Sequence, residues 1–215
     1  MSNIRSHVIG TDGHDGYNRM SDHTLLLIRM LKDVAFLAGG MARYIIFPDM
    51  VKAEDYDFFL FDEADWEKAQ ALVLHQGYEV TEENPNGSLK YMTTDTWAPP
   101  VQLVYPFKAE GGTSGTPTDV ISIFGLTCEQ FALVALENSP DLRAYYYEHA
   151  KNSAEQKLIV PTNEIDPVLT MGRAIKYARK GFSMRRADIL GQFNQWTCLT
   201  DEERGAIHER TVGNY

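Results

Sequence analysis

Two aspartates separated by one residue are the part of the chain best suited to chemistry. Asp55 and Asp57 fall at the start of an aromatic stretch, Tyr56 to Phe61, that predicts a strand. Side chains at positions i and i+2 of a strand point to the same face, so both carboxylates are expected on one side of it. Two oxygen ligands without a His or Cys nearby in the sequence favour Mg²⁺ or Mn²⁺ over zinc. Asp55 and Asp57 are therefore predicted to be catalytic and to bind the metal.

A pair of glycines precedes these aspartates and is suited to binding phosphate. Phe36 to Ala38 predicts a short strand that ends at Gly39 and Gly40, and Met41 to Phe47 predicts the helix that follows. The first amides of a helix have no backbone partners and lie at the positive end of its dipole, so they favour an anion. Gly39 and Gly40 are therefore predicted to bind the phosphates of a nucleotide, with Arg43 adding a charge-assisted hydrogen bond.

A cluster of basic residues lies far downstream, in a helix predicted from Pro167 to Arg179. Arg173, Lys176 and Lys180 fall near one face of this helix, because residues three and four apart are neighbours. The chain has 30 acidic and 20 basic residues and a net charge of -10, so it is not a broadly basic nucleic-acid-binding protein. We expect any nucleic-acid contact to be local, and we predict that Arg173 and Lys176 contact phosphate.

The remaining patterns predict an α+β fold. Helices are expected at Thr24 to Val34, Glu63 to Gln76, Cys128 to Leu136 and Arg185 to Trp196. Strands are expected at Tyr78 to Glu82, Leu89 to Thr93, Val101 to Tyr105 and Val120 to Phe124, with a turn at Asn86-Gly87. The first twenty residues are interpreted as loop, and Lys108 to Thr118 as a loop of unknown role. The predicted division is a first domain of residues 1–140 and a helical C-terminal region of residues 141–215.

The glycine and aspartate motifs together resemble the DNA polymerase beta-like nucleotidyltransferase superfamily. They are most similar to the head of tRNA nucleotidyltransferases and bacterial poly(A) polymerases, in which Gly-Gly-x-x-Arg-Asp is followed by Asp-x-Asp. Tyr44 stands where the family usually has the first Asp. The matching residues are Gly39, Gly40, Arg43, Asp55 and Asp57. The resemblance implies a nucleotidyltransferase-type mixed sheet flanked by helices in residues 1–140, a nucleoside triphosphate such as ATP as substrate, and Mg²⁺ or Mn²⁺ as cofactor.

A second resemblance to the same enzymes lies in Asp166 to Phe182. The enzymes have an Asp-Pro-x-Arg-x-Leu-Arg-Ala-x-Arg-Phe-like helix that joins head to neck. Half of its basic residues have counterparts here, and Thr170 stands where the family has its earlier Arg. The similar pairs are Arg173-Ala174, Lys176-Tyr177 and Gly181-Phe182.

The third acidic position of the superfamily is the main departure. The strand Val101 to Tyr105 takes the place of the strand that usually supplies it, and Gln102 is neutral. A glutamine offers a carbonyl oxygen but no charge, so it is a weaker metal ligand. Asp119 and Glu129 flank the next predicted strand, and either is a candidate substitute.

The motifs leave the function open between an enzyme and a binding protein. The first reading is transfer of a nucleoside monophosphate from the triphosphate to a hydroxyl acceptor, with RNA or tRNA ranked first. A variant of this reading is a toxin-antitoxin-type transferase that modifies a protein or a tRNA end. The alternative is an inactive nucleotidyltransferase-fold protein, encoded by a bacteriophage, that binds nucleotide, RNA or a host protein. No apolar run is long enough to cross a bilayer, and Cys128 and Cys198 without an apolar leader favour the cytoplasm, or the host cytoplasm for a phage protein.

Overall fold

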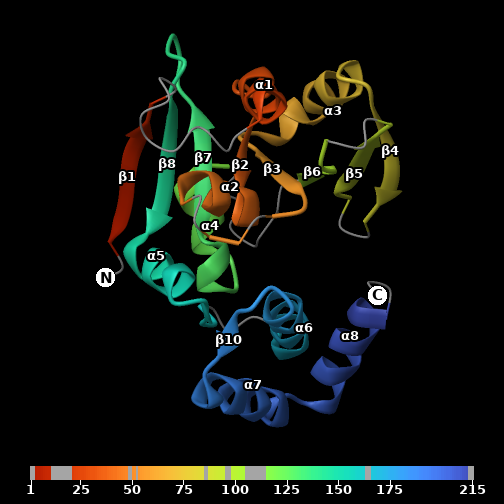
Figure 1. Cartoon of the computed structure of the whole chain (residues 1–215). Coiled ribbons are helices and arrows are strands. Elements are labelled where there is room, and N and C mark those ends of the chain that lie inside the picture. Colours follow the sequence, from red (N-terminus) through yellow and green to blue (C-terminus); the bar gives the residue numbers. More distant parts are fainter. Residues whose placement is uncertain are drawn as a thin grey trace. The chain divides into compact units, whose positions relative to one another are not determined.

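The chain forms two compact units (Figure 1). The computed structural model describes residues 3–10, 21–47, 50–51, 53–84, 87–94, 98–104, 115–162 and 166–212. One unit comprises Met1–Ser122 and Glu129–Glu148, and the other comprises Ile123–Cys128 and His149–Tyr215.

The first unit is built on an eight-stranded sheet with the order β1-β8-β7-β2-β3-β6-β5-β4. Neighbouring strands are antiparallel, except that β3 and β6 run parallel. The strands are β1 (Ile4–Ile9), β2 (Ala35–Ala38), β3 (Tyr56–Leu60), β4 (Tyr78–Glu83), β5 (Leu89–Thr93), β6 (Val101–Val104), β7 (Phe131–Ala135) and β8 (Leu142–Tyr147). The predicted α+β class, with a mixed sheet and flanking helices, is confirmed.

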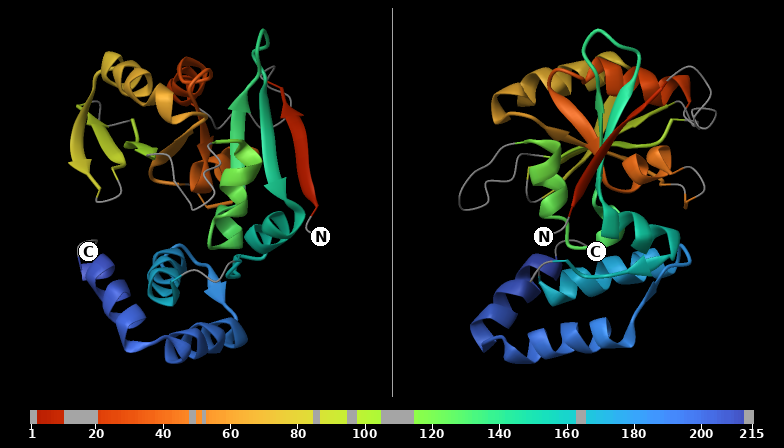
Figure 2. Two further views of the ribbon diagram at one scale, coloured as in Figure 1. Left: turned by 180° about the vertical axis from the view of Figure 1, so that it is seen from behind. Right: turned by 90° about the vertical axis from the view of Figure 1, so that its left-hand side faces the viewer.

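Helices pack on both faces of this sheet, and Figure 2 shows α2 and α4 on opposite sides of it. The helices of the unit are α1 (Asp22–Met30), α2 (Gly39–Ile46), the 3-10 turn η2 (Glu63–Asp65), α3 (Trp66–His75) and α4 (Pro117–Ser122). The side chain of Ser21 caps α1 by accepting a hydrogen bond from the Thr24 amide at 3.2 Å. The Thr24 hydroxyl also hydrogen-bonds the Tyr56 hydroxyl, which ties α1 to one face of β3.

The centre and the edges of the sheet differ in burial. All four residues of β2 are buried, because helices cover both of its faces, whereas most residues of the edge strands β1 and β4 are exposed. In β3, between these extremes, Tyr56, Phe58 and Leu60 are buried and Asp57 and Phe59 are only half-buried. One face of β3 therefore belongs to the core and the other is partly open.

Two of the predicted elements are of the opposite type. Val120 to Phe124, predicted as a strand, begins inside helix α4. Thr116 caps this helix: its hydroxyl accepts from the Asp119 amide at 3.2 Å and donates to the Asp119 carboxylate. Pro117 suits the first turn, so the start signal Thr-Pro-x-Asp outweighs the β-branched residues after it. Cys128 to Leu136, predicted as a helix, contains β7, because an apolar run buried on both faces of a sheet lacks alternation.

Two regions expected to lack strands contain them. Ile4–Ile9, within the stretch interpreted as loop, is the edge strand β1 and pairs with β8. Leu142–Tyr147, at the start of the region expected to be helical, is β8 itself. The boundary proposed near residue 140 therefore falls within the β7–β8 hairpin. Asn86 of the predicted turn and residues 108–114 of the predicted loop lie outside the described residues.

The second unit is mainly helical. Its elements are the 3-10 turn η3 (Thr127–Glu129), which ends in the first unit, α5 (Glu148–Glu155), which starts in the first unit, β9 (Leu158–Ile159), α6 (Pro167–Ala178), β10 (Ser183–Met184), α7 (Arg186–Cys198) and α8 (Asp201–Val212). Asp166 caps α6 by accepting from the amides of Val168 and Leu169 at 2.8 and 3.1 Å. None of the described helices combines the length and apolarity that a membrane crossing requires.

Candidate active site

The junction between β2 and α2 is the first component of the site. Ala38, the last residue of β2, is extended, and Gly39 has a φ of 76°, in the left-handed region that favours glycine. This turn lets the chain pass directly from a buried strand into a helix. The start of α2 has no side-chain cap and no acidic residue in its first turn. Gly39 and Gly40 therefore begin a helix whose first amides are suited to an anion.

Asp57 lies directly beside this junction. β2 and β3 are antiparallel, and Ala38 is the register partner of Asp57. A Cβ atom added to Gly39 would lie 3.5 Å from Oδ2 of Asp57, so the carboxylate approaches the glycine backbone itself. The structure therefore brings together Gly39 and Asp57, which are 18 positions apart in the chain.

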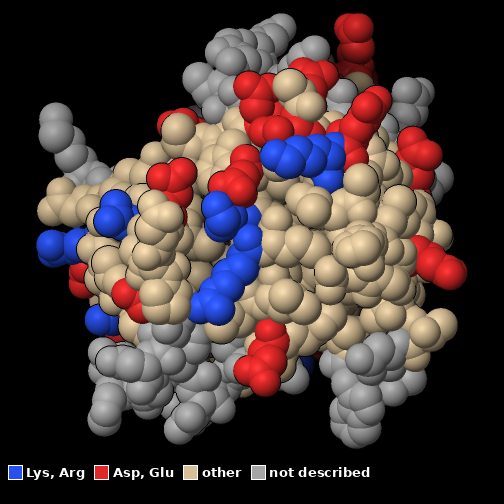
Figure 3. Space-filling view, turned by 90° about the horizontal axis from the view of Figure 1, so that it is seen from above, with Lys and Arg blue, Asp and Glu red and all other residues tan. Residues whose placement is uncertain are grey.

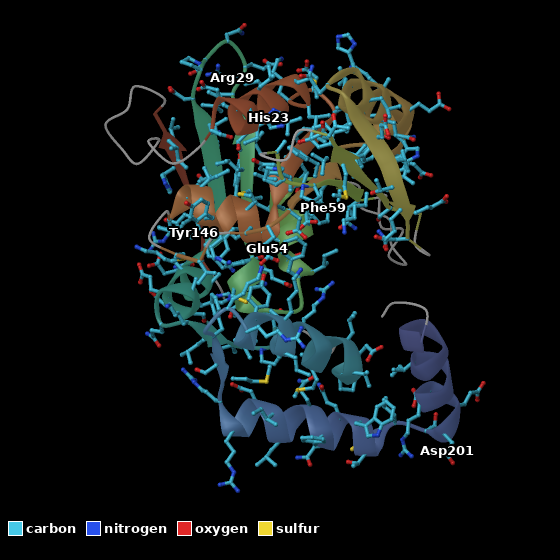
Figure 4. All side chains as sticks on the ribbon, turned by 45° about the vertical axis from the view of Figure 1, so that its right-hand side comes forward. His23, Arg29, Glu54, Phe59, Tyr146 and Asp201 are labelled. Atoms are coloured by element: carbon cyan, nitrogen blue, oxygen red, sulfur yellow. The ribbon has the colours of Figure 1, made fainter. Side chains whose placement is uncertain are left out.

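Asp55 occupies the bend that leads into β3 and is half-buried. Figure 4 labels the preceding residue, the exposed Glu54, and Phe59, which follows Asp57 on the same partly open face of β3. Asp55 thus stands at the entry to the strand that carries Asp57. Its participation as a metal ligand stays a prediction.

Gln102 occupies the strand position next to Asp57. β3 and β6 are parallel, and Asp57 and Gln102 are register partners, so their side chains leave the same face of the sheet. Within the described part of the chain, no three or more His, Cys, Asp or Glu residues are grouped so that they could hold a metal ion. Asp119 and Glu129 therefore do not complete a three-acid cluster with Asp57. Asp119 instead bonds Thr116 at the start of α4.

Arg43 is inside the protein. It lies one turn after Gly39 on α2, is only 1% exposed, and donates a hydrogen bond to the Val51 carbonyl at 3.4 Å. This contact holds the connection between α2 and β3, which is a structural role that the sequence pattern did not reveal. A contact between Arg43 and phosphate stays a prediction.

The basic residues of α6 lie on its exposed side. Thr170, Ala174 and Tyr177 are buried, whereas Arg173 and Lys176 are exposed. Because this helix belongs to the second unit and Asp57 to the first, phosphate binding by Arg173 and Lys176 also stays a prediction. On the face of the protein in Figure 3, Lys and Arg side chains lie among Asp and Glu side chains.

Lys90 is a residue of this sheet face that the sequence motifs did not single out. It lies on β5, between β6 and β4. Its register partner on β6 is Gln102, and its register partner on β4 is Glu82. Lys90 Nζ is 3.8 Å from Glu82 Oε2. The polar position between Leu89 and Tyr91 indicated which face Lys90 occupies, but only the pairing of β5 with β6 places it beside Gln102.

Several solved structures of tRNA-processing enzymes share this fold. A tRNA nucleotidyltransferase complexed with a primer tRNA and an incoming ATP analog matches with a TM-score of 0.57 at 19% identity, over 80% of this chain and 50% of that one. A CCA-adding enzyme with CTP matches with a TM-score of 0.59 at 11% identity, over 80% of this chain and 42% of that one. A tRNA-processing enzyme complex matches with a TM-score of 0.55 at 16% identity, over 80% of this chain and 46% of that one.

These matches define the class of fold: the chain has a nucleotidyltransferase-like fold. It spans about half the length of the enzymes it matches. The sequence matches no protein-family model and no curated protein. At this level of identity the likeness establishes the fold and leaves the reaction to be argued from the site.

Proposed function

We propose that the protein is a metal-dependent nucleotidyltransferase that moves a nucleoside monophosphate from a nucleoside triphosphate to a hydroxyl acceptor. The observation that carries this proposal is the approach of the Asp57 carboxylate to Gly39 at the start of α2. A carboxylate attracts a divalent cation, and the first amides of a helix attract phosphate. The carboxylate and the amides are adjacent, so they suit a ligand that contains both a divalent cation and phosphate groups, as a metal-bound triphosphate does.

The side chains around Asp57 fit a divalent ion that prefers oxygen. Asp57 offers a carboxylate and its neighbour Gln102 an amide oxygen, with Asp55 two residues before Asp57. These are the donor types that Mg²⁺ and Mn²⁺ accept. When bound, the ion would neutralise phosphate charge and help to align the reacting groups.

The remaining roles belong to the protein's own groups. Gly39, Gly40 and the amides that follow would hold the β and γ phosphates. Arg173 and Lys176 stay proposed phosphate-binding residues of the second unit. The acceptor hydroxyl oxygen bonds to the α phosphorus as the bond to the bridging oxygen breaks. Pyrophosphate leaves with the electron pair, and the hydroxyl proton is released to solvent. The protein contributes mainly by positioning these groups.

RNA, and tRNA in particular, is the proposed acceptor. One structural neighbour is a tRNA nucleotidyltransferase bound to a primer tRNA. The exposed Arg173 and Lys176 give this acidic chain a local set of cations for a nucleic-acid backbone. Because the chain spans about half the length of those enzymes, its way of holding an acceptor is a proposal of its own.

The transfer is tested by incubating the protein with each labelled nucleoside triphosphate, Mg²⁺ or Mn²⁺, and total tRNA. We expect label to appear in the RNA with the wild type and to be absent with Asp57→Asn. Asp33→Asn is the matched control, because Asp33 is an exposed aspartate that pairs with Lys32. Transfer that continues unchanged in Asp57→Asn would refute the proposed role of this carboxylate.

Nucleotide binding without transfer is the second candidate function. Gln102 beside Asp57, and the lack of a three-acid cluster among the described residues, favour it. In this case the protein would bind the metal-bound nucleotide and then an RNA or a host protein, as a phage-encoded inhibitor would. Nucleotide binding by the wild type without label transfer to tRNA or lysate components supports this candidate.

A further inference from the structure

Three neighbouring strands carry a row of polar side chains across the partly open face of the sheet. Asp57 on β3 pairs in register with Gln102 on β6, and Gln102 pairs with Lys90 on β5. Register partners project from the same face of a sheet. The row Asp57–Gln102–Lys90 therefore presents an acid, an amide and an ammonium group side by side. In this row, the positively charged Lys90 is the direct neighbour of the neutral Gln102.

Lys90 is accessible and held only weakly. Its side chain is 39% exposed and that of its partner Glu82 is 57% exposed, with 3.8 Å between their charged atoms. Exposed pairs of this kind contribute little to stability, so Lys90 can exchange Glu82 for another anion at little cost. Successive strands are spaced about 4.8 Å apart, which places the Lys90 backbone roughly 10 Å from that of Asp57. The four-carbon stem of lysine covers much of this distance.

The charges of the row favour binding of a triphosphate that carries fewer metal ions than a site with a third carboxylate would hold. A third carboxylate at position 102 would help to hold a second cation, and that cation would neutralise the ligand's phosphates. Gln102 removes this negative charge, and Lys90 supplies a positive charge one strand further on. A lysine ammonium can serve as a point charge for phosphate.

We propose that Lys90 is a substrate-binding residue that contacts the triphosphate of the bound nucleotide, with Glu82 as its partner in the free protein. The inference rests on the proposed function, since it assumes a triphosphate that extends from the start of α2 past Asp57 toward β6 and β5. It assigns to the Lys90 ammonium group the positive charge that a second metal ion would otherwise bring to the phosphates. The arrangement also implies that Glu82 competes with the nucleotide for Lys90.

The test is equilibrium binding of ATP and of CTP in the presence of Mg²⁺, with AMP as the ligand that lacks the triphosphate. Lys90→Met is expected to weaken triphosphate binding about tenfold and AMP binding much less, because one charge-assisted contact is lost. Lys90→Arg is expected to retain most of the affinity. Glu82→Gln is expected to tighten binding slightly, because Lys90 loses its competing partner. Lys68→Met, which alters an exposed lysine of α3, is the matched control.

The outcomes separate this inference from the proposed function. Equal affinity of the wild type, Lys90→Met and Lys68→Met for both triphosphates overturns the role of Lys90, provided that Asp57→Asn weakens binding. Absence of triphosphate binding by the wild type overturns the proposed function and this inference with it. An equal loss of ATP and AMP binding in Lys90→Met, with a lowered free energy of unfolding, assigns Lys90 to structure and also overturns the inference.

Discussion

Two adjacent rows of side chains cross the same three strands and differ in almost every property. Tyr56, Val101 and Tyr91 form one row. The residues next to them in the chain, Asp57, Gln102 and Lys90, form the other. The first row is at most 2% exposed, whereas the second is half-buried and polar. Because strand side chains alternate between faces, a shift of one residue separates the core from the candidate site. The fold can therefore tolerate changes in the polar row that the buried row would not.

The largest effect is expected for Asp57→Asn. The substitution removes the charge that faces Gly39 while it keeps the shape of the side chain. We expect Mg²⁺-dependent affinity for nucleoside triphosphate to fall by about a hundredfold or more, since loss of a charge-assisted contact of this kind costs roughly 3 kcal/mol. The free energy of unfolding, measured by denaturant titration, is expected to change little. A variant that unfolds readily would instead place Asp57 among the structural residues.

Two glycines with similar backbone conformation test whether the β2–α2 junction binds phosphate. Gly39 and Gly77 have φ values of 76° and 80°, so alanine at either is expected to destabilise the protein by about 1 kcal/mol. A Cβ at Gly77 meets nothing within 4 Å, whereas a Cβ at Gly39 faces Asp57. Gly39→Ala should therefore weaken triphosphate binding tenfold or more, and Gly77→Ala should leave it unchanged. Equal binding by both variants would contradict phosphate binding at the junction.

Gln102→Asp tests the neutral position in the polar row. An added carboxylate beside Asp57 is expected to tighten Mn²⁺ binding about tenfold, because it supplies a charged ligand in place of an amide. Titration with Mn²⁺ in the absence of nucleotide measures this directly. Label transfer to tRNA should rise in the same variant for an active enzyme. Weaker metal binding would show that the two side chains do not share an ion.

The smallest expected effects separate the two tyrosines of the buried row. The Tyr56 hydroxyl bonds Thr24, so Tyr56→Phe is expected to lower the free energy of unfolding by about 1 kcal/mol. The Tyr91 hydroxyl is buried and has no hydrogen-bond partner among the described residues. Tyr91→Phe is therefore expected to be neutral or to stabilise the protein by about 1 kcal/mol. Thermal and denaturant unfolding of both variants distinguish these results, and nucleotide binding should be unaffected in each.

The burial of Tyr91 is also expected to lower the free energy of unfolding at alkaline pH. Burial raises the pKa of Tyr91 from 10.0 to about 12. The unfolded chain therefore loses this proton first, and the free energy of unfolding is expected to fall as the pH rises from 10 to 12. Below pH 10 the group has no effect on the pH dependence. Tyr91→Phe should show a shallower loss of stability between pH 10 and 12 than the wild type.

The local motifs of the site were evident in the sequence. The strand, glycine pair, helix and Asp-x-Asp order predicted β2, α2 and β3 close to their observed bounds, because each element has strong local signals. The prediction was wrong at α4 and β7. At α4, the β-branched residues that follow the capped start suggest a strand. At β7, burial on both faces removes the alternation that identifies a strand. The edge strand β1 was missed because it exists through pairing with β8, which lies more than 130 residues away.

By itself the sequence determined the residue types available for chemistry and the α+β class, since both depend on local order and alternation. Only the tertiary structure decided that the Asp57 carboxylate meets Gly39, that Arg43 is buried, and that Lys90 stands beside Gln102. The burial of Arg43 depends on how α2 packs, and the other two relations depend on strand order and register. Such pairings bring together residues far apart in the chain, and no local pattern encodes them.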